Sequence, residues 1–126
     1  MEKLKVLFHI NDSARWQRTL TNIRNFIKDV GEGQADIEVV ANGAAVSGFY
    51  GKCEQGDAAA CGIMEKGLAE EMGTLAQQGV HFAACRNALK MHDLLEEQLP
   101  SYVGVVPAGI TEIIKKQAEG YAYYKA

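Results

Sequence analysis

The sequence predicts an α/β protein with a three-layer, flavodoxin-like fold, in which helices cover both faces of a mainly parallel sheet of four or five strands. Short apolar runs rich in β-branched residues alternate with longer segments of helical periodicity. Turn-forming or helix-capping residues close most of these runs. The chain has 126 residues, with no internal repeat and no linker. We therefore expect residues 1–126 to form a single domain.

The composition is that of an ordinary globular protein, with 48% hydrophobic and 23% charged residues and a net charge of −3. This charge gives no basic surface for nucleic acid or anionic lipid. No signal peptide and no apolar stretch of membrane-spanning length is recognised. The three cysteines match no zinc motif or disulfide framework, and His81 on a predicted strand is expected to be structural. We expect a cytoplasmic protein with reduced thiols and no metal ion.

The first strand and helix are well marked. Leu4–Ile10 is predicted as a strand, and Asn11 and Asp12 follow it as helix-capping residues. Apolar residues then recur at spacings of three and four between Trp16 and Val30, which predicts one apolar helix face. Gly31 is expected to end this helix.

A second strand is predicted at Ile37–Ala41. The glycine-rich residues 43–57 are interpreted as an irregular loop with one helical turn. Within it, Phe49 and Tyr50 are expected either to cover a ligand or to contact another subunit. A second helix is predicted over residues 58–78 from its amphipathic pattern.

The second half repeats the strand and helix pattern. A strand is predicted over residues 80–84, followed by a helix over residues 86–97 that Pro100 keeps from continuing. A fourth strand is predicted over residues 102–106, and a last helix carries the isoleucines that follow it. The pattern does not decide whether Gly120–Tyr124 forms a frayed turn or a short fifth strand.

The expected strand order begins 2-1-3-4, as in flavodoxin-like sheets, so that the first and third strands are neighbours. Open α/β sheets bind ligands at the carboxyl ends of such strands. The crevice there is expected to be lined by His9, Asn11 and Asp12 on one side and by Cys85 and Arg86 on the other.

Cys85 is the candidate for chemistry because it lies where a strand ends and a helix begins. Backbone N–H groups and the helix dipole at such a junction favour a thiolate, and Arg86 and His9 are expected nearby. A thiolate there is a candidate nucleophile or sulfur acceptor. The alternative is a buried, inert cysteine, which is also how Cys61 is interpreted, whereas Cys53 is expected to be exposed without an activating site.

The sequence contains no recognisable cofactor motif. Gly43 and Gly48 have P-loop spacing, but Phe49 stands where lysine is required. Gly31 and Gly33 follow a predicted helix, not the strand that a dinucleotide-binding fingerprint needs. We therefore predict no cofactor.

Several segments together resemble one family. The third strand and its exit, Val80–Leu89, are similar to the cysteine segment of the DsrE/DsrF-like family. Three further segments are similar to the same family: Val6–Asn11, Val39–Gly43 and Val105–Ile110. Residues Lys116–Tyr123 resemble a stand-alone, mostly uncharacterised branch of this family. The similarity runs through nearly the whole chain in order.

The resemblance implies a flavodoxin-like domain that assembles into homo-oligomers, either trimers or hexamers. In the sulfur-relay members, the cysteine matching Cys85 carries sulfur as a persulfide and passes it to a partner protein. The resemblance therefore implies a sulfur carrier or sulfurtransferase with Cys85 as the reactive residue, and a donor or acceptor protein as its partner.

Two other functions remain compatible with the sequence. The crevice could bind a small anionic ligand without catalysis, with Asn11, Asn42 and the backbone near Cys85 supplying hydrogen-bond donors and with His9 and Arg86 beside them. Alternatively, the protein could be chiefly an assembly, with the aromatic loop residues and the tyrosine-rich tail buried between subunits.

Overall fold

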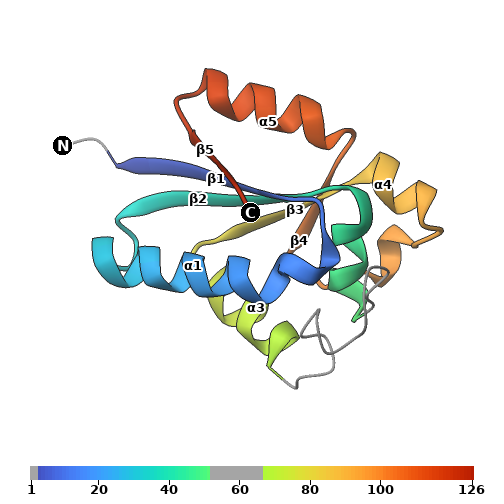
Figure 1. The fold of residues 1–126 in the computed structure, drawn as a ribbon, viewed down its shortest axis with the longest axis horizontal. Helices are drawn as coiled ribbons and strands as arrows, with labels where there is room; N and C mark the ends of the chain where they lie inside the picture. The colour runs from blue at the N-terminus through green and yellow to red at the C-terminus, as the bar shows by residue number, and fades with distance from the viewer. Residues whose placement is uncertain (1–2, 52–66) are drawn as a thin grey trace.

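The structure, a computed structural model, describes residues 3–51 and 67–126 (Figure 1). Its centre is one sheet of five strands in the order β4-β3-β2-β1-β5, and every neighbouring pair is parallel. The predicted α/β, flavodoxin-like class is thereby confirmed. The strands are β1 (Leu4–Ile10), β2 (Ala35–Ala41), β3 (His81–Cys85), β4 (Val103–Val106) and β5 (Ala122–Lys125).

The helices cover the two faces of the sheet unequally. Figure 1 shows α1 and α3 on one side and α5 alone on the other. The α-helices are α1 (Trp16–Val30), α3 (Leu68–Gln77), α4 (Arg86–Met91) and α5 (Gly109–Ala118). The described residues also form three 3₁₀ helices: η1 (Ser13–Arg15), η2 (Gly43–Tyr50) and η3 (Glu96–Gln98).

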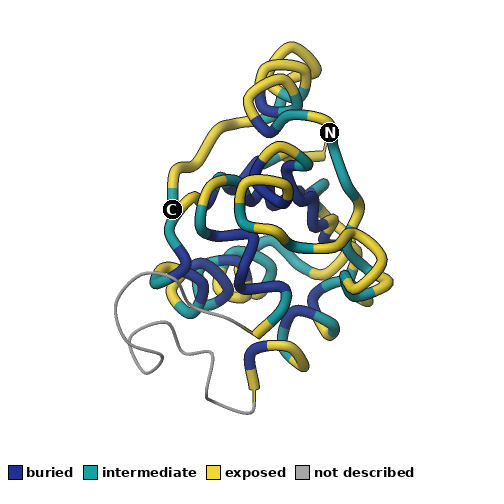
Figure 2. The backbone as a smooth tube through the Cα atoms, turned by 90° about the vertical axis from the view of Figure 1, so that its right-hand side faces the viewer, coloured by how far each residue is buried: buried dark blue, intermediate teal, exposed yellow. Residues whose placement is uncertain are grey.

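Alternation along the strands divides the core into two parts, because successive side chains point to opposite faces of a sheet. The larger part contains Phe8, Val39 and Phe82 together with the apolar residues of α1 and α3. The smaller part consists of Leu7, Val40, Ala83 and Ile113. Figure 2 shows that α5, which covers the smaller part, is exposed along much of its length.

The strand order differs from the expected 2-1-3-4. β2 lies between β1 and β3, and β5 takes the other edge of β1. In a right-handed crossover, the face that the helix covers depends on whether the next strand is added to the left or to the right of the previous one. The helix and strand patterns of the sequence do not determine on which side the next strand is added. Here three successive steps run the same way from β1 to β4, and only the last returns to β1. The expected crevice between β1 and β3 therefore does not form.

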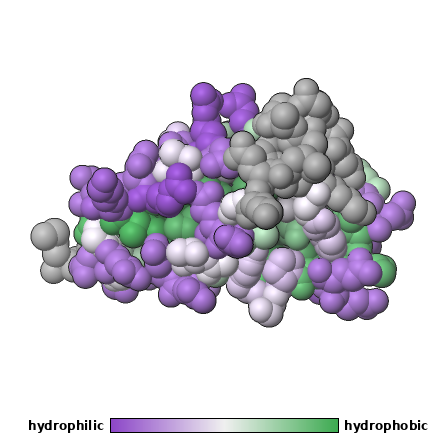
Figure 3. Space-filling view, turned by 90° about the horizontal axis from the view of Figure 1, so that it is seen from below, coloured by the Kyte–Doolittle hydropathy of each residue, from purple (hydrophilic) through white to green (hydrophobic). Residues whose placement is uncertain are grey.

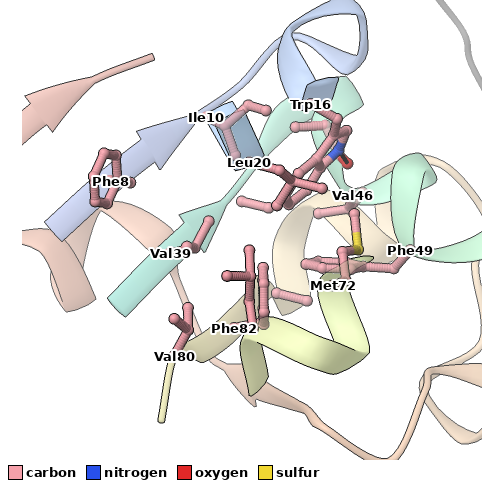
Figure 4. Packing of buried hydrophobic residues seen from close by; sticks show 14 of the residues in the cluster. Phe8, Ile10, Trp16, Leu20, Val39, Val46, Phe49, Met72, Val80 and Phe82 are labelled. Atoms are coloured by element: carbon pink, nitrogen blue, oxygen red, sulfur yellow. Dashed lines mark hydrogen bonds between the residues drawn. The ribbon is translucent and has the colours of Figure 1, made fainter. Parts of the chain in front are cut away.

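Trp16 is the centre of the larger core and is fully buried (Figure 4). Its Nε1 donates to the carbonyl oxygen of Ala45 at 2.8 Å, and its ring lies 5.1 Å from that of Phe49. A Cβ at Gly48 would come within 2.2 Å of Trp16 Nε1, so only glycine fits there. The prediction that Phe49 covers a ligand or contacts a subunit was wrong, since Phe49 is 6% exposed within this core.

The other elements largely follow the prediction. The helix expected over residues 86–97 ends at Met91, and Asp93 adopts a left-handed conformation with φ of 55°. The undecided C-terminal run forms β5, which begins after Gly120 with φ of 97°. The predicted helix over residues 58–78 is observed as α3, while residues 58–66, and with them Cys53 and Cys61, lie outside the described residues.

The outer surface of α1 and α3 is polar. Figure 3 shows mainly hydrophilic side chains on this side, with an apolar band between them. Arg24 of α1 and Glu71 of α3 form an ion pair between the two helices. Within residues 3–51 and 67–126, no helix is long and apolar enough to cross a membrane.

Candidate functional site

Polar side chains from neighbouring strands meet at the carboxyl ends of β5, β1 and β2. His9 of β1 lies between Tyr123 of β5 and Asn42, which follows β2. The Tyr123 hydroxyl is 2.6 Å from His9 Nδ1, and His9 Nε2 is 3.0 Å from Asn42 Oδ1. The three side chains therefore form a hydrogen-bonded chain across this end of the sheet.

The environment keeps His9 neutral. Burial lowers the pKa of His9, and the positive charge of Lys125 lowers it further, while the hydrogen bond with Asn42 opposes both effects. We assign the tautomer from the partners: Nε2–H donates to Asn42 Oδ1, and Nδ1 accepts from the Tyr123 hydroxyl. The arrangement fixes Asn42 with its oxygen toward His9.

The amide nitrogen of Asn42 faces the start of α5, where Cys85 also lies. A Cβ built on Gly109, the first residue of α5, would lie 3.3 Å from Asn42 Nδ2 and 3.5 Å from Cys85 Cβ. Asn42 and Cys85 thus both lie next to Gly109. Because Gly109 has no side chain, the start of α5 can lie close to Asn42 and Cys85.

Cys85 is a free cysteine that is only 6% exposed. It is the last residue of β3 and the N-cap of α4, but its side chain makes no capping hydrogen bond. The sulfur side chain belongs to the larger core cluster. The expected junction of strand and helix is present, whereas the thiol is buried more deeply than a residue lining an open crevice would be.

The positive charge of Arg86 has little effect on Cys85, because Arg86 is paired with Glu96. Its Nε donates to Glu96 Oε2 at 2.7 Å, and both side chains are largely exposed. The same hydrogen bond lowers the pKa of Glu96 and raises that of Arg86. Because Glu96 balances the guanidinium, Arg86 adds little net positive potential at the thiol.

Asn11 and Asp12 have local partners. Asn11 Oδ1 accepts from Lys125 Nζ at 2.9 Å, which ties the loop after β1 to β5. Asp12 caps η1 by accepting from the backbone N–H of Ala14 at 2.9 Å, as its capping role predicted. The structure thus brings His9, Asn42 and Cys85 toward one end of the sheet and gives Asn11, Asp12 and Arg86 other contacts.

Comparisons with known proteins show the family of the chain. The model of the DsrE/DsrF-like family matches residues 4–125. The chain belongs to the DsrE/DsrF-like family. The resemblance drawn from the sequence is confirmed by this match.

A solved structure, described as a protein of unknown function, MTH1491 from Methanobacterium thermoautotrophicum, is similar to this DsrE/DsrF-like chain. The two are 28% identical, with a TM-score of 0.79 over 98% of this chain and 100% of the other. A search of curated proteins finds no match to the chain.

Two residues of this candidate site were missed in the sequence. Tyr123 lies in a tyrosine-rich run whose structure the pattern did not decide, and only the pairing of β5 with β1 brings it to His9. Gly109 lies in the segment Val105–Ile110 that carries the resemblance, and its place above Cys85 depends on how α5 crosses the sheet. The signal in the sequence that could have indicated this close packing is the glycine at the first position of the last helix, Gly109.

The chemistry available at this end of the domain is that of a thiol beside hydrogen-bond donors. Ala108, the N-cap of α5, provides no side-chain cap, so the first N–H groups of this helix keep their hydrogen-bonding capacity and its dipole is positive there. Among the described residues, no group of three or more His, Cys, Asp or Glu is placed to hold a metal ion. These donors suit an anionic sulfur or a small anion.

Proposed function

We propose that the protein carries sulfur as a persulfide on Cys85. The family supports a sulfur-relay type of role. The single observation that carries the proposal for this chain is the position of Cys85 against Asn42 and the first residue of α5. The Asn42 amide and the positive end of α5 would stabilise a negatively charged outer sulfur.

The proposed transfer has two steps that balance without an external oxidant. The Cys85 thiolate attacks the outer sulfur of a donor persulfide, a new S–S bond forms, and the donor leaves as a thiolate. An acceptor thiolate then attacks the outer sulfur on Cys85 and releases the Cys85 thiolate. The donor and acceptor are proposed to be partner proteins.

Sulfur loading can be measured directly by intact mass. In a Cys53→Ser/Cys61→Ser background, Cys85 is the only thiol in the sequence. Incubation with inorganic polysulfide should add the mass of one sulfur atom, and a small acceptor thiol should remove it. The matched control, Cys85→Ser in the same background, should gain nothing. Equal mass gain in both variants, or none in either, would overturn the proposal.

The role of Asn42 is tested separately from loading. Asn42→Ala removes the amide donor beside Cys85, and we expect the persulfide to lose its outer sulfur about tenfold faster, as for a hydrogen bond to a charged group. Thr111→Ala, at an exposed position of α5, serves as the control. An unchanged lifetime in Asn42→Ala would remove Asn42 from the mechanism and leave the loading test standing.

A non-catalytic ligand-binding module is the second candidate, and the burial of Cys85 favours it. A thiol that is 6% exposed reacts slowly unless the site opens. In this alternative the donors of Asn42 and α5 hold a small anion. Phosphate or sulfite should then raise the melting temperature of the wild type and of Cys85→Ser equally, whereas the carrier function is lost completely in Cys85→Ser.

We also propose that the protein is a cytoplasmic homo-oligomer, either a trimer or a hexamer. Large apolar side chains are exposed on α5 and at the end of α4, with exposed fractions of 63% for Ile110, 59% for Ile114 and 80% for Met91. Burial of such side chains between subunits is favourable. A compartment that keeps thiols reduced suits a carrier whose cysteine must be free.

A further inference from the structure

A hollow lies on the α5 side of the sheet, away from the larger core. α5 packs on β1, β2 and β5, and the hollow lies beside it over β3 and β4. Ala83 and Gly104, which are paired in register on these strands, have the smallest side chains available. A cavity of about 340 Å³ results, within the range of small-molecule sites.

Glu38 is a buried carboxyl on this face of the sheet. It belongs to β2, the central strand, and is only 8% exposed while it lines the cavity. Among the described residues, no donor reaches its Oε2. A buried acceptor without a partner costs free energy, so a molecule that donates a hydrogen bond to Oε2 would recover that cost.

The charges around Glu38 favour a cation. Glu112 and Glu119 of α5 add negative charge, and His81 lies opposite Glu38 in register on β3. Two lysines lie on this side. Lys116 lies 3.6 Å from Glu119 and 5.2 Å from the centre of the Tyr121 ring, and Lys5 Nζ donates to the carbonyl oxygen of Glu119 at 3.1 Å. Lys116 is thus engaged by Glu119 and Tyr121.

Glu38 keeps its proton near neutral pH. Burial raises the pKa of Glu38 to about 8, and the hydrogen bond and the negative charge of Glu112 act in the same direction. The charge of Lys116 lowers it by less, and that of Glu119 raises it. A cation that entered beside Glu38 would take the place of this proton.

We propose that this hollow binds a small primary amine with an apolar body, whose ammonium group donates to Glu38 Oε2. The apolar body would lie on Ala83 and Gly104 next to Val106 and Tyr121, which line the cavity and pack against the smaller part of the core. An organic cation fits better than a metal ion, because no group of three metal-ligating side chains exists among the described residues. The inference does not depend on Cys85.

Binding is coupled to proton release. The ammonium group binds in its charged form, Glu38 becomes a carboxylate, and its proton passes to the solvent. Binding should therefore tighten as the pH rises toward about 8, the pKa of Glu38, and should then level off. Calorimetry in two buffers of different ionisation enthalpy measures the released proton directly.

The test uses phenethylamine as the probe and 2-phenylethanol as its neutral analogue. In a titration followed by NMR, phenethylamine should bind saturably and about tenfold more tightly than 2-phenylethanol, as expected for a hydrogen bond to a charged group. Glu38→Gln should abolish this difference. Equal binding of the two probes to the wild type, or an unchanged difference in Glu38→Gln, would overturn the proposal.

A second variant blocks the hollow without changing its acids. A Cβ at Gly104 would meet its nearest neighbour, the Phe82 carbonyl oxygen, at an ordinary 3.9 Å, so Gly104→Val should fold and fill the space. It should lose phenethylamine binding, while Gly73→Ala, where α3 has open space, should keep it. If Gly104→Val instead dissociates an oligomer in light scattering, a second copy of the chain occupies the hollow and the proposal fails.

Discussion

The surroundings of Glu38 make a pH-dependent contribution to stability. The pKa of Glu38 is about 8 in the folded protein, against a usual value of 4.5. Between these values the unfolded chain releases a proton that the folded protein keeps. The free energy of unfolding therefore falls as the pH rises, by about 2–4 kcal/mol up to about pH 8.

Glu38→Gln should remove this dependence. The amide cannot ionise, so the variant should be more stable than the wild type at about pH 8 and similar to it at about pH 4. Urea unfolding at several pH values measures the difference. Asp36→Asn, which removes a carboxyl that is 44% exposed on the same strand, should leave the slope nearly unchanged. A wild type whose stability rises through this range would contradict the assignment.

Gly48 is the second residue for which the structure predicts a clear effect of substitution on stability. Its Cβ would meet the Trp16 indole, whose position is fixed by burial and by the hydrogen bond to Ala45. Gly48→Ala should lower the free energy of unfolding by about 1–3 kcal/mol through overpacking. Gly73→Ala, in the open on α3, should raise it by up to about 1 kcal/mol because alanine favours the helix. Denaturant unfolding of both variants makes the comparison.

At the scale of elements, β5 is held mainly by contacts with β1. Its four residues are all exposed, and its side-chain contacts include those of Tyr123 with His9, Tyr124 with Phe8 and with Asn22 of α1, and Lys125 with Asn11. Short edge strands open locally at a low free-energy cost. The hydrogen bond from Tyr123 to the neutral ring of His9 therefore matters for the whole element.

Acid should loosen β5 by charging His9. The pKa of His9 is lowered from 6.5 in the folded protein, so the stabilisation is complete above about pH 6.5 and is lost as the pH falls through the lowered pKa. Hydrogen exchange of the β5 amides should accelerate between about pH 7 and pH 5 after correction for intrinsic rates. His9→Gln should flatten this change. Uniform exchange of all strands with pH would argue against a local effect.

At the scale of the whole molecule, α5 exposes an apolar surface. Ile110 and Ile114 are both more than half exposed and lie one helical turn apart. If they are buried between subunits, Ile110→Lys should shift light scattering toward the monomer mass of 13.7 kDa, because it introduces a charge into an apolar contact. Thr111→Lys places the same charge at an exposed neighbour and should leave the assembly intact. A monomeric wild type would refute the assembly.

Local sequence patterns predicted most of the elements. Leu4–Ile10, the helix from Trp16 to Val30 and the parallel α/β class follow from periodicity, capping residues and glycine stops, which act within a few residues of the chain. The C-terminal strand was left undecided because four exposed residues carry no alternation to read.

By itself, the sequence determined the fold class, the family and the position of Cys85 between a strand and a helix. Only the tertiary structure decided that β2 separates β1 from β3, that Tyr123 meets His9, and that Glu38 lies buried in a hollow under α5. The physical reason is the range of the forces involved. Strand propensity and capping act locally, whereas strand order and the burial of a carboxyl depend on which distant segments pack together.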